Sequence, residues 1–238
     1  AFAVETFTTG DFIFSTGMRF DIRSQRTFKF SPKNVPDSTV NYMGVSGSVG
    51  AFWQVSKQVS LSSNLSTAFR APSVNELYSE GVHHGTAQYE IGDRTLKPER
   101  AFSWDANLKV NTYHTSSEIG VYAHYFDGYI YTQPSLTSIL TLRGAFPVFQ
   151  YRQTSALIAG IDANTSLFLT DYYRADLSLS WIYGQNLDAK VPLFQIPAPR
   201  GKIINHFHIP DIGTFYHNYV ELGGQFVARQ ARFAENGD

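Results

Sequence analysis

Several absences narrow the class of protein. The 238-residue chain has no cysteine, which excludes a disulfide-bonded scaffold and a thiolate metal site. No window approaches the roughly 18 unbroken apolar residues of a membrane-spanning helix, so a helical membrane protein is excluded. The 19 Lys and Arg nearly balance the 20 Asp and Glu, and a net charge of −1 argues against nucleic-acid binding. The first residues lack a charged-then-apolar segment, so any export signal has been removed or lies upstream.

What the chain does contain is a hydrophobic period of two residues. In residues 12–23 the even positions are mostly apolar and the odd positions mostly polar. Residues 102–110 alternate in the same way, with Phe102 and Trp104 on one side and Asp105 on the other. This is the period of a two-faced β-strand. Aromatic residues make up 15% of the chain, and many lie near the ends of such runs, as the girdles of membrane barrels do.

The alternation predicts about nine full strands and a partial one, most of them long enough to cross a membrane. A tilted spanning strand needs roughly 9 to 11 residues, whereas soluble strands average about 5 to 6. We therefore expect an all-β, antiparallel transmembrane β-barrel, with residues 1–238 forming part of a single barrel domain. The expected strands are 1–7, 12–23, 40–53, 59–70, 99–111, 117–132, 149–168, 175–184, 201–209 and 219–230.

Short and long connectors follow one another in turn, as periplasmic turns and extracellular loops do in such barrels. The short ones include residues 112–116 and 169–174. The long ones are polar and rich in proline, and we expect them to be extracellular. They lie near 24–39, 71–98, 133–148, 185–200 and 231–238.

The longest connector, 71–98, carries an ordered set of motifs: Arg70-Ala71-Pro72, Glu76-Leu77-Tyr78 and Leu96-Lys97-Pro98-Glu99. Together they resemble the barrel region of TonB-dependent outer-membrane receptors. In that family an Arg-Ala-Pro signature ends a strand, a Glu-Leu-Tyr element lies in the loop that follows, and Leu-x-Pro-Glu begins the returning strand. Further likeness lies in Gly17-Met18-Arg19-Phe20-Asp21, Tyr125-Phe126-Asp127-Gly128-Tyr129-Ile130-Tyr131 and Ile196-Pro197-Ala198-Pro199-Arg200.

The resemblance implies a 22-stranded barrel in the outer membrane of a Gram-negative bacterium, closed by an amino-terminal plug that TonB contacts. This chain shows no plug segment and no TonB-contacting segment, and it has no aromatic final residue. About ten strands would also leave two unpaired edges in lipid, which is very costly. We therefore expect this chain to be part of a longer receptor, with the plug outside it.

Candidate ligand-binding residues gather in the same long connector. His83 and His84 lie near Glu80, Glu90 and Asp93, a set that fits a divalent metal or a metal chelate. Adjacent histidines need not face one ion, so a self-bonded polar loop over the plug is the alternative.

The base of this connector is charged. Arg70, Arg100, Glu76 and Glu99 fit either a lock on the loop or a site for an anionic chelate. Tyr78 is a candidate for stacking against a ligand.

Histidines on predicted strands have a second interpretation. His206 and His208 share a strand face with Lys202, at the spacing of strand-borne metal ligands. His124 shares a face with Glu118 and Tyr122. For His206 and His208 the favoured interpretation is a lumen-facing contact with the plug. For His124 it is hydration of the wall or contact with the plug.

Sequence signatures of an enzyme fail. The segment Gly44-Val45-Ser46-Gly47-Ser48 lacks the second glycine of a nucleophile elbow, and no phosphate-binding loop occurs. We predict no catalysis and no resident cofactor. The predicted function is energy-coupled uptake of a scarce ligand, with an iron chelate (siderophore or haem) first and zinc or copper as the alternative. A passive porin or structural barrel and a soluble β-protein are the alternatives of other classes.

Overall fold

The computed structural model describes residues 1–29, 35–211, 213–214 and 216–233. Parts of the predicted outer loops at 24–39 and 231–238 therefore lie outside the described residues. Ten strands form the main path of one sheet, in the order β1-β2-β3-β4-β7-β8-β9-β10-β12-β13. They are β1 (Phe2–Thr9), β2 (Phe12–Thr27), β3 (Ser38–Gln54), β4 (Val59–Arg70), β7 (Glu99–Asn111), β8 (Thr115–Thr141), β9 (Gly144–Thr170), β10 (Tyr173–Asn186), β12 (Arg200–Ile209) and β13 (Asn218–Val227).

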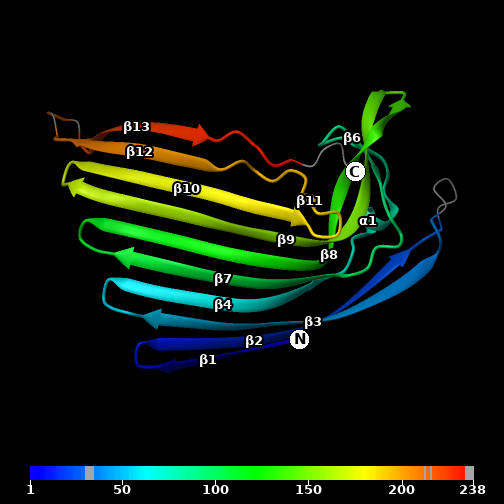
Figure 1. The fold of residues 1–238 in the computed structure, drawn as a ribbon, viewed down its shortest axis with the longest axis horizontal. Coiled ribbons are helices and arrows are strands. Elements are labelled where there is room, and N and C mark those ends of the chain that lie inside the picture. The colour runs from blue at the N-terminus through cyan, green and yellow to red at the C-terminus, as the bar shows by residue number, and fades with distance from the viewer. Residues whose placement is uncertain (30–34, 212, 215, 234–238) are drawn as a thin grey trace.

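Each strand on this path pairs antiparallel with its neighbours, and the result is a partial, barrel-like wall. Figure 1 shows the strands side by side, with the short turns at one end and the small loop elements at the other. Those elements are α1 (Val74–Tyr78), β5 (Glu80–His83), β6 (Gln88–Ile91) and β11 (Val191–Pro192). The predicted all-β antiparallel class is confirmed. In the part of the chain that the structure describes, no helix is long and apolar enough to cross a membrane, and α1 has only five residues.

Exposure follows the alternation along each strand. One face is apolar and open, with Met18, Val49 and Leu65 being 66%, 62% and 61% exposed. The other face is polar, as in the pair of Asn64 and Asp105 across β4 and β7. An apolar outer surface and a polar interior are what lipid on one side and a lumen on the other require.

Aromatic rings mark the end of the wall that carries the short turns. Phe12 and Trp53 stack with ring centroids 5.4 Å apart, and Tyr173 and Phe207 stack at 4.9 Å. Both pairs join neighbouring strands on the apolar face. Their position is that of an interfacial aromatic girdle.

The connector predicted near 133–148 contains regular structure that the sequence alone did not indicate. There β8 continues to Thr141 and β9 begins at Gly144, so most of the segment is a β-hairpin. Ile139 pairs with Phe146 near its tip. The hairpin tolerates Pro134 because the register shifts between Pro134 and Ser138, where an absent N–H does not break the ladder.

A buried apolar cluster lies at the loop end of the wall, beyond the lipid-facing part of the strands. It consists of Leu77 of α1, Leu96 of connector 71–98 and Ile130 of β8, and Tyr78 and Tyr151 pack against it. Folding of connector 71–98 against β8 and β9 is therefore driven by burial of side chains. This connector is a compact unit at the loop end of the wall, hereafter the mouth.

Candidate functional site

Helix α1 is short, yet its first turn is fully capped. Ser73 is the N-cap: its hydroxyl accepts a hydrogen bond from the Glu76 N–H (3.2 Å), and the Glu76 carboxylate accepts one from the Ser73 N–H (2.7 Å). This reciprocal capping box satisfies two backbone donors that would otherwise lack partners. The spacing Ser73 to Glu76 is therefore the local reason that a helix begins here.

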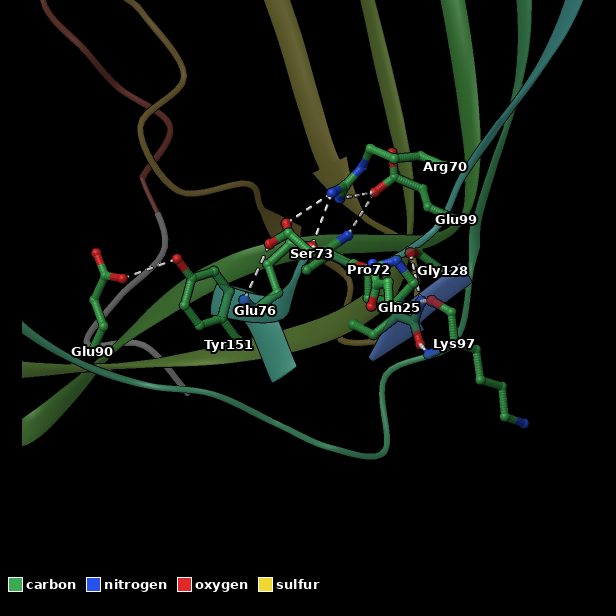
Figure 2. Close-up of polar contacts among 12 residues, drawn as sticks. Gln25, Arg70, Pro72, Ser73, Glu76, Glu90, Lys97, Glu99, Gly128 and Tyr151 are labelled. Atoms are coloured by element: carbon green, nitrogen blue, oxygen red, sulfur yellow. Dashed lines mark hydrogen bonds and ion pairs between the residues drawn. The ribbon is translucent and has the colours of Figure 1, made fainter. Parts of the chain in front are cut away.

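Arg70 joins this helix to the barrel wall, as Figure 2 shows. Its Nη1 donates to both carboxylate oxygens of Glu76 (2.8 and 3.0 Å), and its Nη2 donates to Oε2 of Glu99 (3.1 Å). Glu99 Oε2 also accepts from the Ile130 N–H (2.9 Å). One guanidinium thus connects the ends of β4 and β7 to α1, and through Glu99 to β8.

Two glutamines that the sequence analysis did not select complete the attachment. Gln25 of β2 is buried and donates to the Pro72 carbonyl (2.7 Å). Gln153 of β9 donates to the carbonyls of Lys97 (2.7 Å) and Gly128 (2.8 Å), and accepts from the Lys97 N–H (3.1 Å). These contacts join residues far apart in the chain, so no local sequence signal marks them. Figure 2 labels Gln25 and Pro72, and also Lys97 and Gly128.

Tyr151 of β9 contacts connector 71–98 at Glu90 of β6. It directly follows the three residues of β9 that pair in parallel with β6, beyond the lipid-facing part of the wall. Its hydroxyl donates to Oε2 of Glu90 (3.0 Å). Burial, together with the hydrogen bond to the Glu90 carboxylate, raises the pKa of Tyr151 to about 12. The neutral phenol therefore remains the donor well above physiological pH.

The two predicted metal ligands point to different partners. His83 Nδ1 is 3.0 Å from the Thr86 hydroxyl and 4.0 Å from Glu90 Oε1. His84 Nε2 is 3.1 Å from Nη1 of Arg143, a cation. Across the described ranges no three His, Asp or Glu side chains come together as a metal site. The metal-binding role of His83 and His84 stays a prediction.

The remaining predicted residues have partners within the loop. Asp93 Oδ1 accepts from the backbone N–H and the hydroxyl of Thr95, at 2.8 and 2.6 Å. Tyr78 lies under the guanidinium of Arg94, 5.3 Å from the ring centroid, and packs on the apolar cluster. The structure thus brings Arg70 and Glu76 together, places Glu90 at Tyr151, and gives Asp93 and Tyr78 loop contacts.

The strand histidines lie on the polar face. His206 is buried, with Nε2 2.7 Å from Asp176 Oδ2 and Nδ1 2.8 Å from Glu221 Oε1. His208 is exposed. His124 is 3.8 Å from Asp105 Oδ1. Asp176 of β10 and Glu221 of β13 lie on opposite sides of the His206 ring, so these side chains form a hydrogen-bonded row across three strands.

A curved antiparallel wall with one lipid-type face and one polar face defines part of an outer-membrane β-barrel. A family model described as TonB dependent receptor-like, beta-barrel, matches residues 1–238. The chain therefore belongs to the TonB-dependent receptor β-barrel family, and the resemblance drawn from the loop motifs is confirmed.

Solved structures of similar fold carry several kinds of ligand in their names. The copper transporter OprC matches 99% of this chain and 35% of its own, at 20% identity and a TM-score of 0.78. The FrpB iron transporter from Neisseria meningitidis matches 95% of this chain and 32% of its own, at 16% identity and a TM-score of 0.67. The alcaligin outer-membrane receptor FauA from Bordetella pertussis matches 97% and 37%, at 15% identity and a TM-score of 0.62. This chain spans about a third of the length of each of these proteins.

Proposed function

We propose that this chain is the ligand-capturing part of an outer-membrane receptor for energy-coupled uptake of an iron chelate, a siderophore or haem. The observation that carries the proposal is the ordered connector 71–98, held at the mouth of the wall by Arg70. A passive pore has no need of a mouth loop that is held by hydrogen bonds to side chains of β2, β4 and β9. A receptor does, because affinity rises when a binding surface is already ordered before the ligand arrives.

A chelate fits the polar groups at the mouth better than a bare ion does. A free transition metal needs several nitrogen or carboxylate ligands converging on one point. The part of the chain that the structure describes offers no such group of three. A chelate already has its metal coordinated, and it needs hydrogen-bond donors, cations and rings from the protein, which the mouth supplies.

The partners follow from the family. We propose outer-membrane lipid around the apolar face, a plug domain outside this sequence in the lumen, and TonB reaching the receptor through that plug. The location that goes with them is the outer membrane of a Gram-negative bacterium. Nothing in this scheme requires a nucleic acid, a catalytic group or a resident cofactor.

Zinc or copper uptake is the second candidate within the family. The name of the copper transporter OprC, together with the nearness of His83 to Glu90 at 4.0 Å, favours it. Replacing both His83 and His84 with alanine would then abolish binding of the free metal ion. Calorimetric titration of the full-length receptor with copper or zinc separates this candidate from the chelate receptor, whose binding the change leaves intact.

Uptake by the full-length receptor tests the proposal. A Gram-negative host without its own iron receptors is supplied with radioactive iron as a panel of chelates, with and without TonB. Uptake of one chelate that stops when TonB is deleted is the expected result. Equal uptake in both strains, graded only by solute size, would establish a passive porin. Uptake of copper or zinc in place of every iron chelate would establish the second candidate.

A further inference from the structure

A groove crosses the apolar face of the wall where β10, β12 and β13 lie side by side (Figure 1). Its volume is about 570 Å³. The exposed side chains of Leu179, Ile203 and Phe226 form its walls. Leu179 pairs with Gly201, and Gly201 pairs with Phe226, so these residues lie in one row across the three strands. The groove therefore belongs to the face that meets lipid.

Two glycines form the floor of the groove, Gly201 of β12 and Gly224 of β13. A Cβ at Gly224 would meet no atom within 4 Å, and a Cβ at Gly201 would meet only the Ser178 carbonyl oxygen, at 3.7 Å. Neither glycine has a positive φ, so the backbone does not require glycine at either position. The missing side chains leave a hollow whose walls gain contacts only from atoms outside the chain.

A smaller pocket, of about 170 Å³, adjoins the groove on the mouth side. Trp181 follows Leu179 by two residues and Pro199 precedes Gly201 by two, so the same face continues from the groove into this pocket. Its lining also includes Pro192, Ile196, Arg229 and Arg232. Because tryptophan side chains concentrate at the membrane–water interface, we place this pocket at the depth of the lipid headgroups.

Arg232 supplies positive charge at this depth. Its guanidinium lies over the Tyr183 ring, 3.8 Å from the centroid, and its Nη2 donates to Oε1 of Gln185 (2.6 Å). Positions 181, 183 and 185 point to the same side of β10, so both contacts lie on the lipid-facing side. The side chain of Arg232 is exposed, and stacking on a ring leaves the N–H edge of a guanidinium open to an anion.

Carboxylates do not neutralise this charge within the part of the chain that the structure describes. There, neither Arg229 nor Arg232 forms an ion pair. The acidic residue of the adjoining connector, Asp188, accepts hydrogen bonds from Thr154 and Ser155 of β9. Thr154 also bonds to Asn186 on the polar face, so Asp188 is held on the side of the lumen. An anion at headgroup depth is therefore attracted to Arg232.

We propose that this face of β10, β12 and β13 binds one phosphorylated lipid of the outer leaflet. Arg232 pairs with the phosphate, and an acyl chain passes Trp181 and fills the groove over Gly201 and Gly224. Two observations select this occupant: the groove is continuous with the lipid-facing surface, and a cation lies at its mouth end. The site rests on the proposed outer-membrane location. It lies on the opposite side of the wall from the lumen, so it does not depend on which ligand is taken up.

Native mass spectrometry of the purified full-length receptor in detergent tests the site. The probes are phosphatidic acid, diacylglycerol with the same chains and no phosphate, and glycerol phosphate, which has no chains. The wild-type receptor is expected to bind phosphatidic acid about fivefold more tightly than diacylglycerol, because one arginine contacts the phosphate. Glycerol phosphate is expected to bind more weakly than phosphatidic acid, because it gains nothing from the groove.

Substitutions at the two ends of the site separate its parts. Arg232→Gln is expected to abolish the preference for phosphatidic acid over diacylglycerol, and Arg232→Lys is expected to retain it. Gly224→Leu fills the groove while keeping the surface apolar. It is expected to weaken binding of both chain-bearing probes about tenfold, since about two methylene groups lose their contact.

Matched controls lie elsewhere on the wall. Ala51→Leu adds an apolar side chain to the lipid-facing side of β3, and Arg143→Gln removes an exposed arginine from the hairpin between β8 and β9. Both variants are expected to bind all three probes as the wild type does. Heat-modifiable gel mobility confirms that each barrel is folded.

Three results would overturn the lipid site. The first is equal binding of phosphatidic acid and diacylglycerol by the wild type, or a preference that Arg232→Gln leaves intact. The second is lipid binding that Gly224→Leu does not weaken, because the groove then holds no chain. The third is binding of glycerol phosphate as tight as that of phosphatidic acid, which would identify a simple anion site. Failure of the proposed uptake function is distinguishable, since TonB-dependent uptake is measured separately.

Discussion

Arg70 donates three hydrogen bonds at the mouth, two to Glu76 and one to Glu99. The two carboxylates that it pairs with, Glu76 and Glu99, are only 14% and 12% exposed, whereas Arg70 itself is 42% exposed. Removing the guanidinium would leave two largely buried negative charges close together. The contribution of Arg70 is therefore chiefly to keep those carboxylates compatible with a folded loop.

Arg70→Gln is expected to loosen connector 71–98 by about 2 kcal/mol while leaving the wall intact. Amide hydrogen exchange measures this, with faster exchange at Ser73 and Glu76 and unchanged exchange in the paired part of β4. Arg100→Gln, at the adjacent position on β7, is the control. Equal protection of the loop in wild type and Arg70→Gln would show that the apolar cluster alone holds it.

Asp188 gives the connector between β10 and β12 a dependence on pH. Hydrogen bonds from the Ser155 N–H and the Thr154 hydroxyl hold the pKa of the Asp188 carboxylate below its ordinary value. A lowered pKa in the folded state stabilises the protein above the unfolded-state value of about 4. That stability is lost as pH falls through the lower, folded-state pKa.

Asp188→Asn is accordingly expected to lower the melting temperature of the detergent-solubilised receptor near neutral pH. The difference from wild type should shrink as the pH falls through the lowered folded-state pKa of Asp188, because the wild-type carboxylate then becomes protonated. Asp171→Asn, in the turn at the opposite end of the wall, controls for the change of charge. A difference that persists unchanged into acid would show that the amide fails for a steric reason.

At the scale of elements, the sequence analysis did not predict the bulge in β8, where the register with β9 shifts between Phe126 and Tyr129. The bounds of β4 and β7 were predicted to the residue. Both strands show the period of two, and the Arg-Ala-Pro and Leu-x-Pro-Glu motifs mark where β4 ends and where β7 begins. The length of β8 and β9 was not predicted, because Pro134 and nearby polar residues indicate a loop when the chain is considered alone. Cross-strand pairing supplied the missing information.

In the candidate site, too, local features can be recognised from the sequence, whereas contacts between distant strands cannot. The capping box of α1 is visible in the spacing of Ser73 and Glu76, and a charged lock at the loop base was one of the predicted interpretations. Gln25 and Gln153 could not be found from the sequence, since their partners lie in other strands. The adjacency of His83 and His84 carried no information about where the rings point. Only the fold places them at Thr86 and Arg143.

Gly128→Ala is expected to disturb the bulge and the mouth together. The added Cβ would lie 2.6 Å from Gln153 Nε2, and it would be strained at a φ of +73°. The expected cost is about 2 kcal/mol, since backbone strain adds to the loss of Gln153 contacts. Gly10→Ala is the matched control, with φ of +54° and nothing within 4 Å of the new Cβ. Chemical unfolding of the two variants in lipid measures the difference, and equal costs would show that strain alone is responsible.

At the scale of the whole molecule, the two faces of the wall have opposite tolerance for charge. Leu65 is on the apolar face and its neighbour Ser66 on the polar one. Leu65→Arg is expected to destabilise the barrel in lipid vesicles by about 3 kcal/mol, whereas Ser66→Arg costs little. Reversible unfolding in vesicles measures both. Similar costs for the two substitutions would contradict the assignment of the lipid face.

The parallel pairing of β6 with β9 has a consequence for the order of assembly. Glu90 and its neighbours find their partners at Phe149 and Gln150, which are synthesised after two further wall strands, β7 and β8. Contacts between distant parts of a chain form late, because loop closure has its entropic cost before the contact compensates for it. The wall must therefore reach β9 before connector 71–98 is fastened. If assembly stops before β9 joins the wall, connector 71–98 remains unfolded and exposed. Proteases are then expected to cleave the chain first in this connector.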